Sequence, residues 1–158
     1  YLEKVSADDG TGLHVIELGS FAPGAPAVGE HAIAVGSTLK PEIAWIPISA
    51  NSMEEARIFE LAGTETESLF KAHLWGPDLA WVTQFSTDQI HVVDLNTGFL
   101  NPAPFPEDGI RISGGGSLFR GAQALAIDQD KHQGDMGIVL LGLSAEIAFL
   151  DFRQVFGP

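Results

Sequence analysis

The sequence contains no cysteine among its 158 residues. Without cysteine the chain has no disulfide framework, no thiolate nucleophile and no zinc site of the Cys type. This absence excludes several catalytic mechanisms, but it does not assign the protein to a cellular compartment.

Basic residues are also scarce, because 8 Lys and Arg stand against 21 Asp and Glu and give a formal net charge of −13. Such a surface repels phosphate groups and anionic lipid head groups. The basic residues are scattered along the chain and form no stripe: Lys4, Lys40, Arg57, Lys71, Arg111, Arg120, Lys131 and Arg153. We therefore expect no nucleic acid partner.

Long apolar runs are missing as well. The longest run, Gly137 to Ala145, is about half of what a membrane-spanning helix needs. No charged segment followed by an apolar one opens the chain, so we expect no membrane insertion. The first residue is Tyr1 rather than Met, and the chain starts in a strand-like stretch. These features predict a processed form or a piece of a longer protein, and we expect a periplasmic or extracellular location.

The composition is that of a globular protein, with 45% hydrophobic and 18% charged residues, and a chain of this length usually forms one domain. Short runs rich in β-forming residues are separated by Gly, Pro, Asn and Asp throughout. We therefore predict an all-β chain with a single domain over residues 1–158.

An internal repeat is the clearest pattern in the sequence. Pro41–Ile46 and Pro77–Val82 match in residue class at every position, and each contains Ala-Trp. Each is followed by a run that ends in an acidic residue and Leu. The same kind of ending recurs along the chain: Val15–Leu18, Ile58–Leu61, Val92–Leu95 and, with Phe last, Phe149–Phe152. Self-similarity of this kind predicts repeated structural units.

Two further elements complete the predicted unit. An opening strand is expected at His31–Val35 and Gln123–Ile127, and in the middle copy at Phe70–Leu74. A fourth strand is expected at Gly109–Ser113. The sequence thus predicts units of four short antiparallel strands, at approximately 1–28, 29–68, 69–121 and 122–158.

The segment Leu79–Gly98 resembles the pattern of the YVTN/WD40-like β-propeller superfamily: a strand, a tight turn, a strand ending in acid-Leu, and a Thr-Gly turn. The resemblance implies antiparallel, propeller-like repeats with about three four-stranded blades. A β-sandwich is the alternative, because it shows the same alternation of apolar residues. Closed propellers typically have about four to eight blades. We therefore expect another protein chain as a partner, or self-association.

The resemblance also suggests candidate site residues, because the residue that opens each innermost strand of a propeller points toward the central channel. These positions lie near His31, His73 and Gln123. His31 resembles the His that often opens the inner strand in YVTN-type and lactonase-like propellers. A neutral imidazole there could ligate a metal or act as a base. The alternative is a His that is hydrogen-bonded to the backbone of a neighbouring blade.

A second candidate site is an acidic turn. Asp128, Asp130 and Asp135 surround Lys131 between two predicted strands, and oxygen ligands at alternate positions suit Ca²⁺. A solvated, Asp-rich hairpin is the alternative. Trp45 and Trp81 occupy equivalent positions of the repeat, which indicates packing between blades.

Three functions are compatible with these features. The first is a noncatalytic module of β-propeller type that binds a ligand or a protein, or that assembles. The second is a propeller enzyme of the hydrolase, lyase or quinoprotein-like kind, with a channel site near His31 and an unidentified cofactor. The third is a structural protein of a virion or filament with a β-sandwich fold.

Overall fold

The computed structural model describes residues 1–5, 8–61, 69–75, 78–84, 89–112, 122–127, 136–141 and 146–151. Over these residues the chain is all-β, as predicted, and its one helical element is a 3₁₀ turn, η1, at Met53–Glu55. No helix in this part of the chain has the length and apolar character that crossing a bilayer requires. The strands are β1 Leu2–Val5, β2 Gly12–Ile16, β3 Pro23–Val28, β4 Ala32–Ser37, β5 Glu42–Pro47, β6 Arg57–Glu60, β7 Leu69–Trp75, β8 Leu79–Gln84, β9 Gln89–Asp94, β10 Ile110–Arg111, β11 Ala122–Ile127, β12 Met136–Leu141 and β13 Glu146–Asp151.

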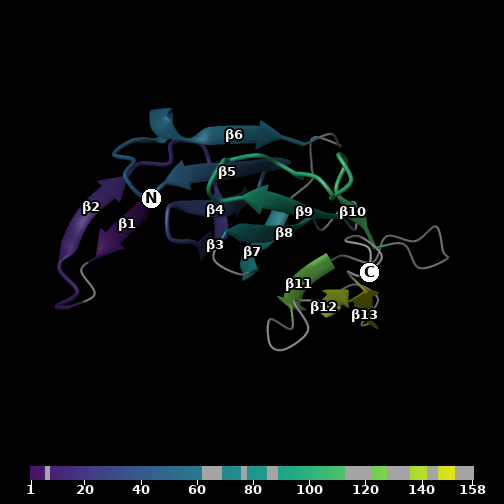
Figure 1. Cartoon of the computed structure of the whole chain (residues 1–158). Coiled ribbons are helices and arrows are strands. Elements are labelled where there is room, and N and C mark those ends of the chain that lie inside the picture. The colour runs from purple at the N-terminus through teal and green to yellow at the C-terminus, as the bar shows by residue number, and fades with distance from the viewer. Residues whose placement is uncertain are drawn as a thin grey trace.

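Two complete four-stranded antiparallel sheets form the centre of the molecule (Figure 1). One consists of β3, β4, β5 and β6 in chain order, and the other of β7, β8, β9 and β10. The hairpin β1–β2 precedes them, and the three-stranded antiparallel sheet β11–β12–β13 follows. Sheets of four antiparallel strands, as expected from the sequence, are therefore present at β3–β6 and β7–β10.

The first strands of successive sheets are equivalent to one another. β3 and β7 run parallel and are joined by one bridge, Ala25 to Lys71, and β11 lies against β7 and β8. Each of the three also has an irregular register with the strand that follows it: between Pro23 and Pro26, between Leu69 and Ala72, and between Ala122 and Ala124. The described sheets therefore come together at their first strands.

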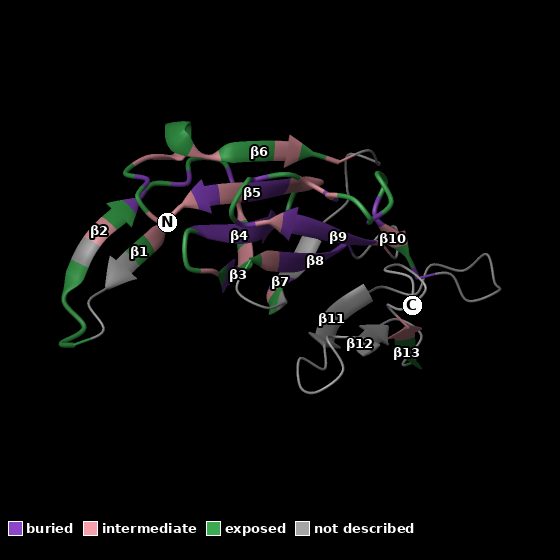
Figure 2. Ribbon diagram, in the orientation of Figure 1, coloured by how far each residue is buried: buried purple, intermediate pink, exposed green. Residues whose placement is uncertain are grey.

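The described residues form three buried apolar clusters, each with members from more than one sheet or hairpin. Figure 2 shows the buried positions along the central strands β4, β5, β8 and β9. Alternate residues of a strand point to opposite faces, and here both faces are covered. In β4, Ala34 belongs to the core shared with β7–β9, whereas Val35 belongs to the core shared with β2. In β8, Val82 faces the first sheet and Trp81 faces the third. Burial on both faces explains why these strands read as continuous apolar runs.

One strand was absent from the sequence prediction. β3 contains Pro23, Gly24 and Pro26, residues that normally argue against a strand because Pro cannot donate to a sheet. Its place at the inner end of the sheet makes these residues tolerable, because only β4 pairs with it extensively. The first complete sheet consequently starts at Pro23, ahead of the predicted unit start at residue 29.

The strands that contain Trp45 and Trp81 hold different positions in their sheets, although the repeat in the sequence aligns them. β5 is the third strand of its sheet and β8 is the second, so the likeness lies between the hairpins β5–β6 and β8–β9. Each hairpin is closed by a backbone bond from a Leu: Leu61 N donates to Pro41 O at 2.7 Å, and Leu95 N donates to Asp78 O at 2.7 Å.

Both Trp side chains pack between sheets, in different cores. Trp81 is fully buried and makes a T-shaped contact with Phe105, with ring centroids 5.5 Å apart. Trp45 is half-buried in the core between the two complete sheets, and its indole Nε1 donates to Leu95 O at 3.0 Å. Arg57 lies over the Trp45 ring at 5.1 Å and donates to Thr97 O at 2.7 Å.

Candidate functional site

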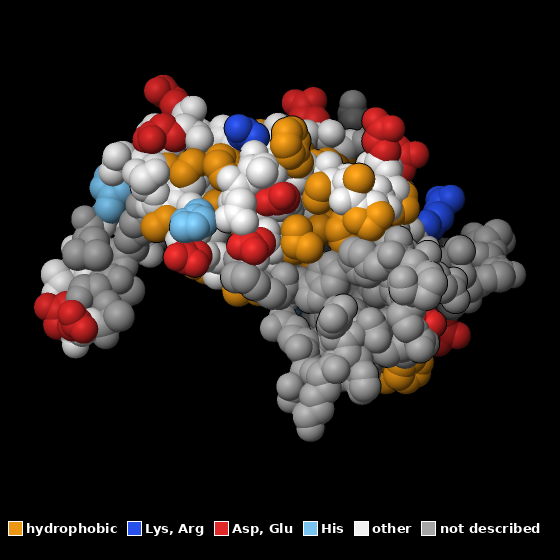
Figure 3. All heavy atoms as spheres, viewed as in Figure 1, with side chains coloured by type: hydrophobic (Ala, Val, Ile, Leu, Met, Phe, Trp, Pro, Cys, Tyr) orange, Lys and Arg blue, Asp and Glu red, His pale blue; other side chains and the backbone are white. Residues whose placement is uncertain are grey.

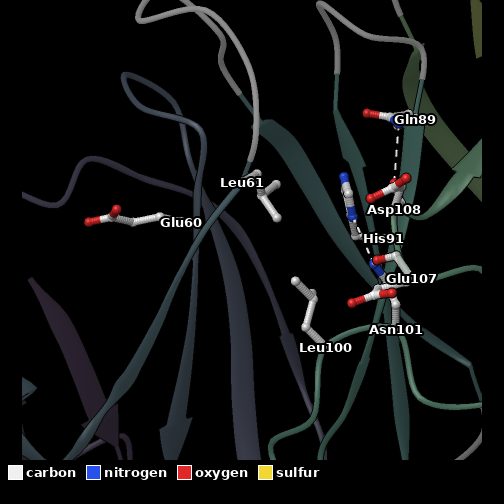
Figure 4. Close-up of a pocket in the computed structure, with 8 residues that line it drawn as sticks. All are labelled: Glu60, Leu61, Gln89, His91, Leu100, Asn101, Glu107 and Asp108. Carbon is white, nitrogen blue, oxygen red and sulfur yellow. Dashed lines mark hydrogen bonds between the residues drawn. The ribbon is translucent and has the colours of Figure 1, made fainter.

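A pocket of about 370 Å³ opens between the two complete sheets, a size within the range of small-molecule sites. One wall is the end of β6 and the residue after it. The other wall is β9 with the long connection from β9 to β10. The lining residues are Glu60, Leu61, Gln89, His91, Leu100, Asn101, Glu107 and Asp108 (Figure 4).

A hydrogen-bonded network centred on His91 builds the second wall. The Asn101 side chain is fixed by the backbone, because its Oδ1 accepts from Val92 N at 2.8 Å and its Nδ2 donates to Glu107 O at 2.8 Å. The same Nδ2 lies 3.2 Å from His91 Nδ1, so this ring nitrogen must act as the acceptor. His91 Nε2 then carries the proton and donates to Gln84 Oε1 at 2.9 Å.

The network holds the imidazole in its neutral form. His91 is only 4% exposed, and burial lowers its pKa to about 4, with the nearby Asp108 carboxylate opposing part of that shift. A proton on Nδ1 would also replace the acceptor that Asn101 Nδ2 requires. His91 is therefore a structural and uncharged member of the pocket wall at neutral pH.

Two residues with positive φ allow the connection to close over His91. Asn101 has φ 47° and Gly109 has φ 85°, in the left-handed region that Asn tolerates and Gly prefers. A Cβ at Gly109 would lie 2.8 Å from Ile90 O and 2.9 Å from His91 Nδ1. Glycine is needed there because the backbone comes this close to the His91 ring.

Carboxylates lie around the pocket without forming a metal centre. Figure 4 shows the carboxylates of Glu107 and Asp108 on the His91 side of the pocket, whereas the carboxylate of Glu60 points away from them. No group of three or more His, Asp or Glu among the described residues could hold a metal ion. The pocket can therefore offer carboxylate oxygens to a ligand, without a described set of metal ligands.

The predicted channel residues occupy dissimilar places. His31 is exposed in the turn between β3 and β4, and its carbonyl accepts from Ile48 N at 2.8 Å. It therefore follows the first strand of its sheet instead of opening it. His73 is half-buried within β7, opposite Trp81. Gln123 lies in β11 at the irregular step between Ala122 and Ala124. Neither His31 nor His73 is among the residues that line the pocket.

The predicted Ca²⁺ ligands Asp128, Asp130 and Asp135 lie outside the described residues. The Ca²⁺ site therefore stays a prediction.

Sequence reasoning missed the pocket because its residues come from segments that lie apart in the chain. The connection between β9 and β10 carries no motif, and Leu61 follows a strand of the other complete sheet. One feature of the sequence could have indicated this wall of the pocket: the polar residues Gln84 and His91 lie in the otherwise mainly apolar strands β8 and β9. Polar residues in buried strands must find hydrogen-bond partners, and here they find each other.

Comparison of the sequence with models of known protein families and with curated proteins finds no match. The candidate site is therefore defined by its own geometry.

Proposed function

We propose that the chain is a noncatalytic assembly module of β-propeller type, which associates with a second copy of itself through the open face of its last sheet. The parallel pairing of β3 with β7, and the blade-like stacking of the sheets, support the propeller type. The exposure of Ile147 and Phe149 on β13 supports the assembly.

The two faces of β13 differ sharply. Ala148 and Leu150 pack against the core that contains Trp81. Ile147 and Phe149, on the other face, are 59% and 70% exposed. Figure 3 shows hydrophobic side chains at the surface in the region that Figure 1 labels β13. Large apolar side chains grouped on an edge strand mark an interaction site.

A second copy fits this face best in a symmetric dimer, in which the exposed faces of the two β13 strands contact each other. The outer side of the hairpin β1–β2 exposes Glu3, Val15 and Glu17, so a head-to-tail contact would bury two carboxylates at a high cost. A contact related by a twofold axis pairs Ile147 and Phe149 with their own copies and buries mainly apolar surface.

Sedimentation velocity of the purified chain tests this proposal. The unmodified chain should sediment as a dimer in the micromolar range, and Phe149→Lys should sediment as a monomer. Leu39→Lys is the matched control, because it changes another exposed apolar side chain, 68% exposed, in the turn between β4 and β5.

The control should leave the dimer intact. A monomeric unmodified chain would refute the proposal, and so would equal dissociation by both substitutions. Circular dichroism of each variant establishes that a change in mass does not arise from unfolding.

A further inference from the structure

The pocket between the two complete sheets has no role in the assembly proposed above, since none of its lining residues lies on β13. It joins an apolar side, formed by Leu61 and Leu100, to a polar side that contains His91 (Figure 4). A pocket of this size with both kinds of lining has the character of a small-molecule site.

The hydrogen-bond donors of the polar side are engaged within the protein. Asn101 Nδ2 donates to His91 Nδ1 and to the Glu107 carbonyl, and His91 Nε2 donates to Gln84 Oε1. Gln89 Nε2 donates to the Asp108 carbonyl at 3.1 Å. These bonds fix the polar side and direct its N–H groups toward the protein.

Acceptors face the pocket instead. The exposed carboxylates of Glu107 and Asp108 follow one another in the connection that ends at Gly109. Figure 4 shows Asp108 between Gln89 and His91, and Glu107 beside Asn101. Lys40 pairs with Glu42, at 3.6 Å, and not with a carboxylate of the pocket. Neither pocket carboxylate is therefore neutralised by a described basic side chain.

The buried imidazole cannot supply the missing positive charge. Protonation of His91 at Nδ1 would break the bond from Asn101, and Asn101 cannot turn its amide without losing its bonds to Val92 N and the Glu107 carbonyl. The pocket thus holds two adjacent negative charges against a neutral, rigid wall. A ligand that carries both positive charge and hydrogen-bond donors complements this arrangement.

We propose that this pocket binds a small organic cation, with an ammonium or guanidinium group on the carboxylates of Glu107 and Asp108 and an aliphatic part against Leu61 and Leu100. An organic cation fits better than a metal ion, because the described residues offer no group of three metal ligands. A guanidinium can also meet a carboxylate with two parallel hydrogen bonds.

Isothermal titration calorimetry with agmatine, a flexible aliphatic molecule with a guanidinium and an ammonium group, tests the inference. We expect saturable binding at one site per chain, weakened by added salt. The double substitution Glu107→Gln and Asp108→Asn keeps the side-chain shapes and removes both charges. It should weaken binding about tenfold or more, as the loss of charge-assisted hydrogen bonds predicts.

Two matched controls sharpen the result. Glu54→Gln removes an exposed carboxylate from η1 and should leave the affinity unchanged. The neutral diol 1,5-pentanediol keeps an aliphatic chain and donors without charge and should not bind. Unchanged agmatine binding in the double variant, equal weakening in Glu54→Gln, or equal binding of the diol would each overturn the inference.

Nuclear magnetic resonance of the unmodified chain gives a second readout that does not depend on the folding of a variant. Agmatine should shift the side-chain amide signals of Asn101 and Gln89 and leave those of Asn51, in the turn before η1, unmoved. Shifts spread over the whole acidic surface would contradict a site in this pocket.

Discussion

The central strands β8 and β9 and the last strand, β13, differ in how their two faces are buried. On β8 and β9 the residues of both faces are buried, including Trp81, Val82 and Ile90. On β13 one face is covered and the other exposes Ile147 and Phe149. The strands have similar sequences, so the difference arises from the number of neighbouring sheets. The comparison teaches that similar apolar strands in this chain differ in burial according to the sheets that lie against them.

The largest expected effect contrasts an interior aromatic residue with one at the open end. Trp81→Ala should lower the free energy of unfolding by about 3 to 5 kcal/mol, because it leaves a large cavity in the core around Phe105. Phe149→Ala should change it by less than about 0.5 kcal/mol in the monomer, because the side chain is already in water. Urea unfolding of both variants, at protein concentrations low enough to prevent association, measures the difference in unfolding free energy. Similar losses for the two would break the comparison.

A pH-dependent effect of intermediate size comes from the buried network between the sheets. His91 in the folded chain has a pKa of about 4, against 6.5 as the ordinary value. Between these two values the unfolded chain binds a proton that the folded chain does not, so stability must fall as the pH is lowered. The His91 contribution to the free energy of unfolding should drop by about 2 kcal/mol from about pH 7.5 to about pH 5.

His91→Gln is the control for this pH dependence of the unfolding free energy, because it removes the titrating ring and leaves the carboxylates in place. Urea unfolding at the two pH values should show a clearly smaller drop in this variant. An equal drop in both proteins would assign the pH dependence to the carboxylates and contradict the neutral, buried imidazole.

The smallest expected effect concerns the rim that joins the two complete sheets. Arg57 donates to the carbonyls of Thr97 and Gly98 and lies over the Trp45 ring. Arg57→Ala should cost about 1 kcal/mol of unfolding free energy, because an exposed cation–π contact and hydrogen bonds to charged groups are each of modest strength. Lys40→Ala, which breaks the exposed pair with Glu42, should cost less than about 0.5 kcal/mol. Thermal unfolding of the two variants ranks them, and the reverse ranking would refute a role for Arg57 in joining the sheets.

The fold class was accessible from the sequence because strand alternation and turn residues are local signals. The segments around Trp45, Trp81 and Ile138 all fall in strands. β3 was inaccessible, because its prolines contradict strand propensity and only its position at the inner end of the sheet permits them. The places of Trp45 and Trp81 within their sheets were inaccessible too, because aligned hairpins need not occupy aligned positions.

The candidate site was not predicted from the sequence, and the reason is physical. His31 and His73 were selected because they were expected to open innermost strands, yet His31 lies in an exposed turn and His73 lies within β7. The pocket instead depends on Asn101 and Gly109, whose positive φ angles favour these residue types, and on Leu61, which follows a strand of the other complete sheet. Residue type alone does not indicate which backbone donors a side chain will meet.

The sequence by itself determined that this chain forms short antiparallel strands, carries a strong negative charge and repeats a hairpin. These properties follow from side-chain pattern and composition, which act over a few residues. The tertiary structure alone decided that β3 and β7 run side by side, that His91 is neutral, and that Ile147 and Phe149 of β13 are exposed. Such properties depend on contacts between segments distant in the chain, where desolvation and hydrogen-bond partners are fixed only once the sheets have stacked.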